Sequence, residues 1–258
     1  LGLYLALALM KNQIAHPEAA QALFGAAAGW VFLVKYTDCG LFAGLGLCLL
    51  IGVICREGWL SAVCAALRML LGVVLVCLPA AGYLAVNGAL GDCVNVYFIQ
   101  NLFDYSGTPM TLTGHLYNAL AYLRTQSMVN PALALAAGAG MLFIAADAIR
   151  THERGFWAQA LAVPMGAGLL LLTCYWGEMA HPYYALVFAA FVSVGLIPLG
   201  WLAPKLEKSG LRALALPAAG ALSVVPVCMG LCSAVPLMKV QKADMPQTIF
   251  AEIMNREV

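Results

Sequence analysis

Long apolar runs are the feature that most constrains the fold of this chain. A helix needs about 20 apolar residues, within a range of about 17–25, to cross the hydrocarbon core of a bilayer. The sequence therefore predicts an all-α, multi-pass transmembrane helix bundle of about seven or eight membrane segments, some short or truncated. The apolar runs are 1–10, 19–34, 39–55, 59–86, 131–149, 156–176, 183–202 and 213–238.

The first runs are shorter than the others. Run 1–10 begins within apolar sequence, so we expect a helix truncated at the start of the chain. Runs 19–34 and 39–55 are joined only by KYTD, which leaves open a shallow hairpin or two crossings. We expect residues 1–238 to form the transmembrane domain, and 239–258 to begin a truncated extracytoplasmic segment.

Composition agrees with a membrane protein and excludes several soluble classes. The chain is 63% hydrophobic and 10% charged, whereas soluble domains are about a quarter charged. Its net charge of +1 and its lack of a basic cluster argue against a nucleic-acid partner. The nine cysteines form no CxxC pair, and the sequence contains no GxGxxG, P-loop, GxSxG or HExxH motif. No cofactor is identified, and a need for a divalent metal cannot be derived.

Loop charge predicts the orientation. Membrane proteins concentrate lysine and arginine in cytoplasmic loops. Loops 11–18, 56–58, 150–155 and 203–212 hold Lys11, Arg56, Arg150, Arg154, Lys205, Lys208 and Arg212. Segments 35–38, 87–130, 177–182 and 239–258 cover 74 positions against 27 for the first group, yet hold only Lys35, Arg124, Lys239, Lys242 and Arg256. We therefore place the first group in the cytoplasm and the second outside the cytoplasmic (inner) membrane.

The outer loop 87–130 has a pattern of its own. Apolar residues recur at helical spacing in two stretches, ALGDCVNVYFIQNLF (89–103) and LTGHLYNALAYLR (112–124). Between them lies DYSGTPMT, whose glycine and proline are typical of a turn. We expect two amphipathic helices on the outer leaflet. They form either a simple connector or a lid over a lipid-linked substrate.

Two polar clusters on this outer face are candidate binding sites. In CYWGEMAHPYYALVFAAF (174–191), Pro182 can start a helix and the tyrosines can anchor it at the interface. The alternative is that Glu178, His181, Tyr183 and Tyr184 contact a phosphate or a sugar. In KYTD, Lys35 and Thr37 could hold a lipid phosphate, or Lys35 could reach the headgroups beside a compensating Asp38.

Two further ionisable residues lie within or near apolar runs. Asp147 precedes Arg150 by three positions, and we expect a local ion pair rather than a proton relay. Arg68 is expected to extend to the cytoplasmic interface. The sequence shows neither an internal repeat nor a mid-membrane acid, which argues against an ion-coupled carrier.

Three segments resemble the C-terminal half of the transmembrane part of bacterial GT-C glycosyltransferases. GWVFLVKYTDCGLFAGLGLCLL (29–50) resembles the family's Lys-x-Thr segment between two short helices. HPYYALVFAAF (181–191) resembles its extracytoplasmic Arg-Tyr helix start, with Pro182 where the family often has arginine. DMPQTIFAEIMNREV (244–258) resembles the segment that follows its last helix.

The resemblance implies an enzyme, a hexosyl or pentosyl transferase that uses a polyprenyl-phosphate-linked sugar donor at the outer leaflet. It implies phosphate contacts from Lys35 and His181, and a cavity lined by Tyr183 and Tyr184. The catalytic acid of such enzymes lies in the first outer loop, so we expect it upstream of Leu1. Two other functions remain open: a transporter or flippase of lipid-linked sugars, and a non-catalytic membrane scaffold.

Overall fold

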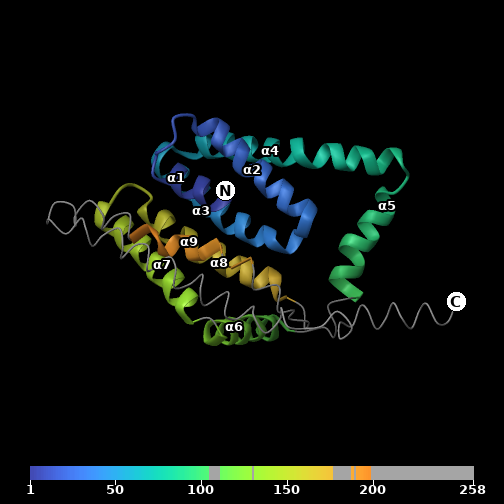
Figure 1. Cartoon of the computed structure of the whole chain (residues 1–258). Coiled ribbons are helices and arrows are strands. Elements are labelled where there is room, and N and C mark those ends of the chain that lie inside the picture. The colour runs from blue at the N-terminus through green and yellow to red at the C-terminus, as the bar shows by residue number, and fades with distance from the viewer. Residues whose placement is uncertain (105–110, 130, 177–186, 189, 199–258) are drawn as a thin grey trace, which may run out of the picture.

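The computed structural model describes residues 1–104, 111–129, 131–176, 187–188 and 190–198, and these residues form helices and no strand (Figure 1). The fold is all-α, as predicted. The helices are α1 (Gly2–Met10), α2 (Pro17–Lys35), η1 (Tyr36–Asp38), α3 (Cys39–Glu57), α4 (Trp59–Val86), α5 (Leu90–Cys93), the π-helix η2 (Val94–Asp104), α6 (Leu112–Val129), α7 (Pro131–Thr151), α8 (Phe156–Cys174) and α9 (Val192–Gly195).

Local sequence explains where the long helices begin. Pro17 occupies the first turn of α2, where its fixed φ suits the helix and its missing N–H is not needed. Gly58, at φ 93°, separates α3 from α4, and Gly155, at φ 82°, precedes α8. Positive φ is a conformation that glycine adopts without steric cost.

Among the residues that the structure describes, four stretches are long and apolar enough to cross a membrane: Pro17–Glu57, Trp59–Val86, Ala134–Thr151 and Phe156–Cys174. The first of these holds both α2 and α3, and Figure 1 shows α3 turning back from the end of α2. The chain therefore reverses direction between runs 19–34 and 39–55 and forms a helical hairpin, whereas the shallow depth considered for it stays a prediction. Each arm has 19 residues, which is about 28 Å of helix at 1.5 Å per residue.

The helices pack in layers, with α4 against α2, α3 against α8, and α8 against α7 (Figure 1). One cluster of buried residues is centred on α1–α3 and includes Phe24, Leu45 and Leu49. A second, centred on α7 and α8, includes Ile144 and Leu170. The α3–α8 contact joins them.

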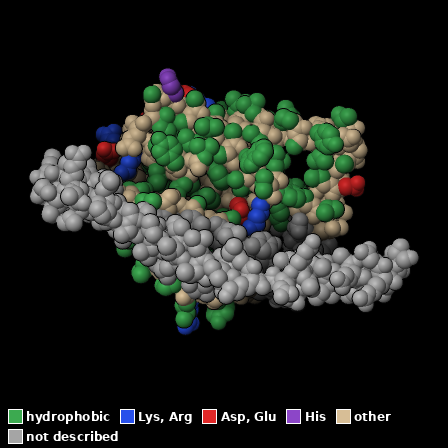
Figure 2. Space-filling view, viewed as in Figure 1, with side chains coloured by type: hydrophobic (Ala, Val, Ile, Leu, Met, Phe, Trp, Pro, Cys, Tyr) green, Lys and Arg blue, Asp and Glu red, His purple; other side chains and the backbone are tan. Residues whose placement is uncertain are grey.

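Apolar side chains cover much of the outer surface as well (Figure 2). Trp30, Leu60, Leu78 and Leu142 are each at least 63% exposed although they belong to long helices. A soluble monomer rarely exposes apolar patches of this extent. Lipid is the medium that suits such a surface, so the chain is a multi-pass membrane protein.

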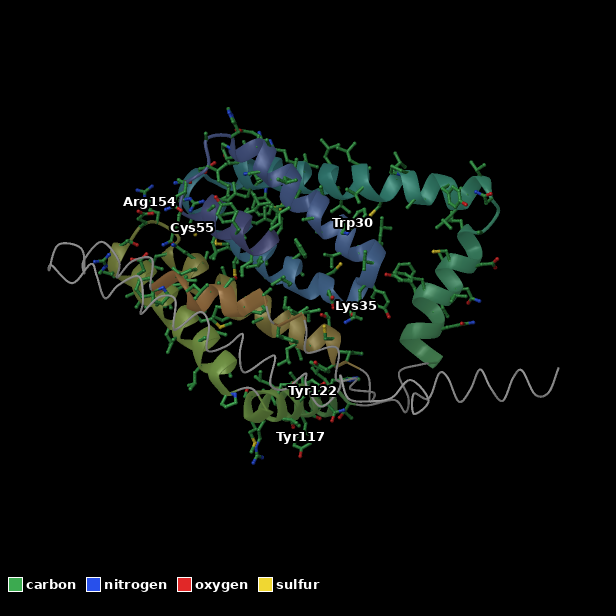
Figure 3. All side chains as sticks on the ribbon, in the orientation of Figure 1. Trp30, Lys35, Cys55, Tyr117, Tyr122 and Arg154 are labelled. Atoms are coloured by element: carbon green, nitrogen blue, oxygen red, sulfur yellow. The ribbon has the colours of Figure 1, made fainter. Side chains whose placement is uncertain are left out.

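The loops of the two charge groups that the structure describes lie at opposite ends of the helices. At one end Arg56 Nη1 donates to the Met10 carbonyl at 2.7 Å, and Lys11 Nζ lies 2.9 Å from Asp147 Oδ2. At the other end Lys35 pairs with Asp38, and Cys174 Sγ contacts the same carboxylate. Figure 3 shows Arg154 and Lys35 at these two ends. Loops 177–182, 203–212 and 239–258 lie outside the described residues, and the cytoplasmic location of the basic end stays a prediction.

Two helical segments do form in segment 87–130, which we call the outer loop after its predicted location, although the first is not a regular α-helix. The single turn of α5 continues as the π-helix η2 through Asp104, and α6 follows at Leu112. Run 183–202 is described only in part, as α9 and its neighbours, and run 213–238 lies outside the described residues.

Candidate functional site

The site is built on the break between α2 and α3. The backbone of Lys35 is extended, at φ −158° and ψ 91°, so the chain leaves the axis of α2 before the short turn η1. This change of direction places Lys35, Thr37 and Asp38 together at the tip of the hairpin. The end of α8 packs against η1 and brings Cys174 to the same place.

Donors from three residues converge on one carboxylate oxygen, Asp38 Oδ1. It lies 3.2 Å from Lys35 Nζ, 3.5 Å from Thr37 Oγ1 and 3.3 Å from Cys174 Sγ. We call these four residues the Asp38 cluster. The Lys35 and Asp38 side chains are 29% and 18% exposed, so the ion pair is partly withdrawn from solvent.

A group of aromatic side chains packs beside the Asp38 cluster. Tyr97, from η2, meets Tyr36 edge-on at a centroid distance of 5.3 Å and Phe98 edge-on at 5.1 Å. Phe98 also stacks on Phe32 of α2 at 5.5 Å. The outer loop therefore docks onto the hairpin tip. The sequence predicted a helix around Tyr97 but gave no sign of this contact.

The second predicted cluster lies outside the described residues, since Glu178, His181, Tyr183 and Tyr184 all fall within 177–186. The two residues directly before this segment are described. Tyr175 packs against Tyr122 of α6 at a centroid distance of 3.8 Å, and Trp176 stacks on His115 at 4.1 Å. Trp176, the last described residue before this segment, follows Cys174 of the Asp38 cluster by two positions.

The opposite end holds a second ionic group. The predicted pair of Asp147 with Arg150 is present at 3.3 Å, but Lys11 is closer, at 2.9 Å. The lysine follows α1, so this contact joins α1 to α7. A mainly apolar cleft of about 720 Å³ lies beside it, between α1, α7 and α9.

Arg68 has a partner within the bundle. Its Nη1 donates to Gln21 Oε1 of α2 at 3.1 Å, and Gln21 is only 8% exposed. Arg68 therefore makes a specific contact between α2 and α4, and its extension to the cytoplasmic interface stays a prediction.

Replacing Asp147 by asparagine should lower the free energy of unfolding by about 1–2 kcal/mol, because Lys11 would lose its carboxylate while partly buried. The measurement is titration with sodium dodecyl sulfate of the chain in lipid–detergent bicelles, followed by circular dichroism. Glu153→Gln, at an exposed position of the same end, is the control and should change the midpoint little. Equal effects of the two variants would mean that the Lys11 contact contributes no stability.

The described residues contain no group of three or more His, Cys, Asp or Glu side chains that could hold a metal ion. Comparison of the chain with models of protein families, with curated proteins and with solved structures finds no match.

Proposed function

We propose that this chain is the C-terminal membrane part of a GT-C-type glycosyltransferase. The enzyme would transfer a sugar from a polyprenyl-phosphate donor to a cell-envelope acceptor at the outer face of the cytoplasmic membrane. The observation that carries the proposal is the Asp38 cluster, a partly buried lysine and threonine at a helix break in a mainly apolar bundle. Ionisable groups within membrane-embedded regions are costly and usually serve function.

The location of the cluster suits a lipid phosphate. A polyprenyl chain occupies the apolar membrane while its phosphate stays near the surface, which is the depth of a loop that joins two membrane helices. Lys35 supplies positive charge there, and Thr37 supplies a hydroxyl donor. The segment with Glu178, His181, Tyr183 and Tyr184 begins just beyond Cys174, so it would meet the sugar attached to that phosphate.

The chemistry follows from these roles. Transfer joins the acceptor oxygen to the anomeric carbon, breaks the bond from that carbon to the phosphate oxygen, and passes the acceptor proton to a general base. Negative charge on the departing phosphate rises as that bond breaks. A cation fixed beside the phosphate, as Lys35 would be, stabilises this charge.

Lys35→Gln should weaken binding of polyprenyl phosphate about tenfold, which corresponds to about 1.4 kcal/mol, because glutamine keeps a polar side chain of nearly the same length but lacks the charge. The chain is reconstituted in neutral-lipid nanodiscs, and native mass spectrometry measures bound polyprenyl phosphate against bound polyprenol. The matched control is Arg124→Gln, which removes an exposed charge from the outer loop and should leave the ratio unchanged.

Two results would contradict the proposal. Equal binding of the phosphate and the alcohol by the unmodified chain would exclude a phosphate site. Phosphate-selective binding without sugar transfer by the full-length protein in membranes would instead favour a carrier of lipid-linked sugars.

A further inference from the structure

The Tyr97 hydroxyl occupies an unusual place at the end of α2. It accepts a hydrogen bond from the Tyr36 backbone N–H at 3.3 Å and donates to the Phe32 carbonyl at 2.9 Å. The Leu33 carbonyl is a second acceptor at 3.3 Å. One side chain from the outer loop thus contacts three backbone groups of α2 and η1, more than 60 positions away in the sequence.

The backbone groups that Tyr97 contacts are ones that an α-helix would pair with each other. Tyr36 N–H and Phe32 C=O are four residues apart, which is the donor–acceptor pair that closes a turn of an uninterrupted α-helix. The hydroxyl therefore lies within the hydrogen-bond ladder where the helix ends. Insertion of a side chain into this ladder is a recognised cause of sharp bends in helices. The residue at this bend is Lys35, whose backbone is extended.

The aromatic neighbours of Tyr97 hold its hydroxyl in place, and burial keeps that hydroxyl protonated, so that it can donate a hydrogen bond. The Tyr97 ring is held edge-on by Tyr36 and Phe98. Burial raises the pKa of Tyr97 above its ordinary value of 10.0, so the phenol stays protonated at any physiological pH. It can therefore donate to a carbonyl and accept from an N–H at the same time.

We propose that Tyr97 is a positioning residue for the Asp38 cluster. Its hydroxyl holds the bend between α2 and η1, and this bend aims Lys35 and Thr37 toward Asp38. The outer loop thus controls the geometry of the cluster from outside the hairpin. The consequence for lipid phosphate rests on the proposed function, whereas the control of the backbone does not.

The backbone part is tested by Tyr97→Phe, which keeps the ring and removes only the hydroxyl. Hydrogen–deuterium exchange of the chain in nanodiscs should show the Tyr36 amide exchanging roughly three- to tenfold faster, the range that one neutral hydrogen bond provides. Tyr117→Phe is the control, because Tyr117 is 73% exposed on α6 and points away from the bundle (Figure 3). Unchanged exchange at Tyr36 in Tyr97→Phe would overturn the inference.

The binding part is tested by a double-mutant cycle. Tyr97→Phe should weaken polyprenyl phosphate binding about threefold, leave polyprenol binding unchanged, and have no further effect in the Lys35→Gln background. A merely structural role would weaken both lipids, or would add to Lys35→Gln in full, and either result would overturn the positioning role. If the unmodified chain does not distinguish phosphate from alcohol, the proposed function fails, and amide exchange alone decides whether Tyr97 holds the bend.

Discussion

Replacing Gly72 by alanine should lower the free energy of unfolding by about 2–3 kcal/mol, the upper part of the range for overpacking. The backbones of α2 and α4 are in contact at this point. A Cβ atom added to Gly72 would lie 1.9 Å from the Ala22 carbonyl oxygen, and one added to Gly25 would lie 1.8 Å from the Met69 carbonyl oxygen. No side-chain movement can relieve a clash with backbone, so the helices must separate.

Separation would affect the whole interface. Membrane helices have no hydrophobic drive to associate in lipid and depend on close packing and interhelical hydrogen bonds. The Arg68–Gln21 hydrogen bond and the contact of Cys77 Sγ with the Gly29 carbonyl lie along the same α2–α4 interface. Both would weaken if Gly72 no longer allowed the helices to approach.

The matched control is Gly82→Ala on the same helix. A Cβ atom there meets nothing within 4 Å, and alanine favours the helix by up to about 1 kcal/mol over glycine. Gly82→Ala should therefore be neutral or slightly stabilising in bicelles titrated with sodium dodecyl sulfate, whereas Gly72→Ala should lower the midpoint. If both variants behave alike, the α2–α4 contact is not as close as the structure places it.

The helices were predictable because a helix that crosses a bilayer needs a long apolar segment, and because Pro and Gly mark the ends of several of these helices. Run 59–86 coincides with α4, and runs 131–149 and 156–176 differ from α7 and α8 by two residues at one end. Periodicity also predicted helices in the outer loop. It could not predict that η2 is a π-helix, since the apolar spacings of the two helix types are too similar over so short a segment.

The partners of the polar residues were less predictable. Asp147 and Arg150 are three residues apart, so helical geometry alone suggests their pair. Lys35 and Asp38 belong to one four-residue connection, so their pair was also suggested by closeness in sequence. Cys174 lies 136 positions from Asp38, Lys11 lies 136 positions from Asp147, and Tyr97 lies 65 positions from Phe32. Such pairs depend on which helices are neighbours, and one sequence contains no pattern that reports this.

Replacing Asp38 by asparagine should lower the free energy of unfolding by about 1–3 kcal/mol, because it removes the negative charge that Lys35, Thr37 and Cys174 all contact. Lys35 would remain partly buried without its carboxylate, and Thr37 and Cys174 would donate to a neutral group instead of an anion. Loss of one partner of a buried ion pair costs about 3–5 kcal/mol, and we expect less here because both side chains retain some exposure. Asp92→Asn, at an exposed position of α5, should change the midpoint little.

The double variant Lys35→Gln/Asp38→Asn separates the ion pair from the rest of the cluster. With both charges gone no unpaired charge remains, so the double variant should be more stable than the sum of the two single effects predicts, by about 1 kcal/mol. Additive effects would mean that Lys35 and Asp38 act independently, despite the 3.2 Å between Nζ and Oδ1. In that case the hairpin tip would be held by the Cys174 and Tyr97 contacts, and Lys35 would be oriented without help from Asp38.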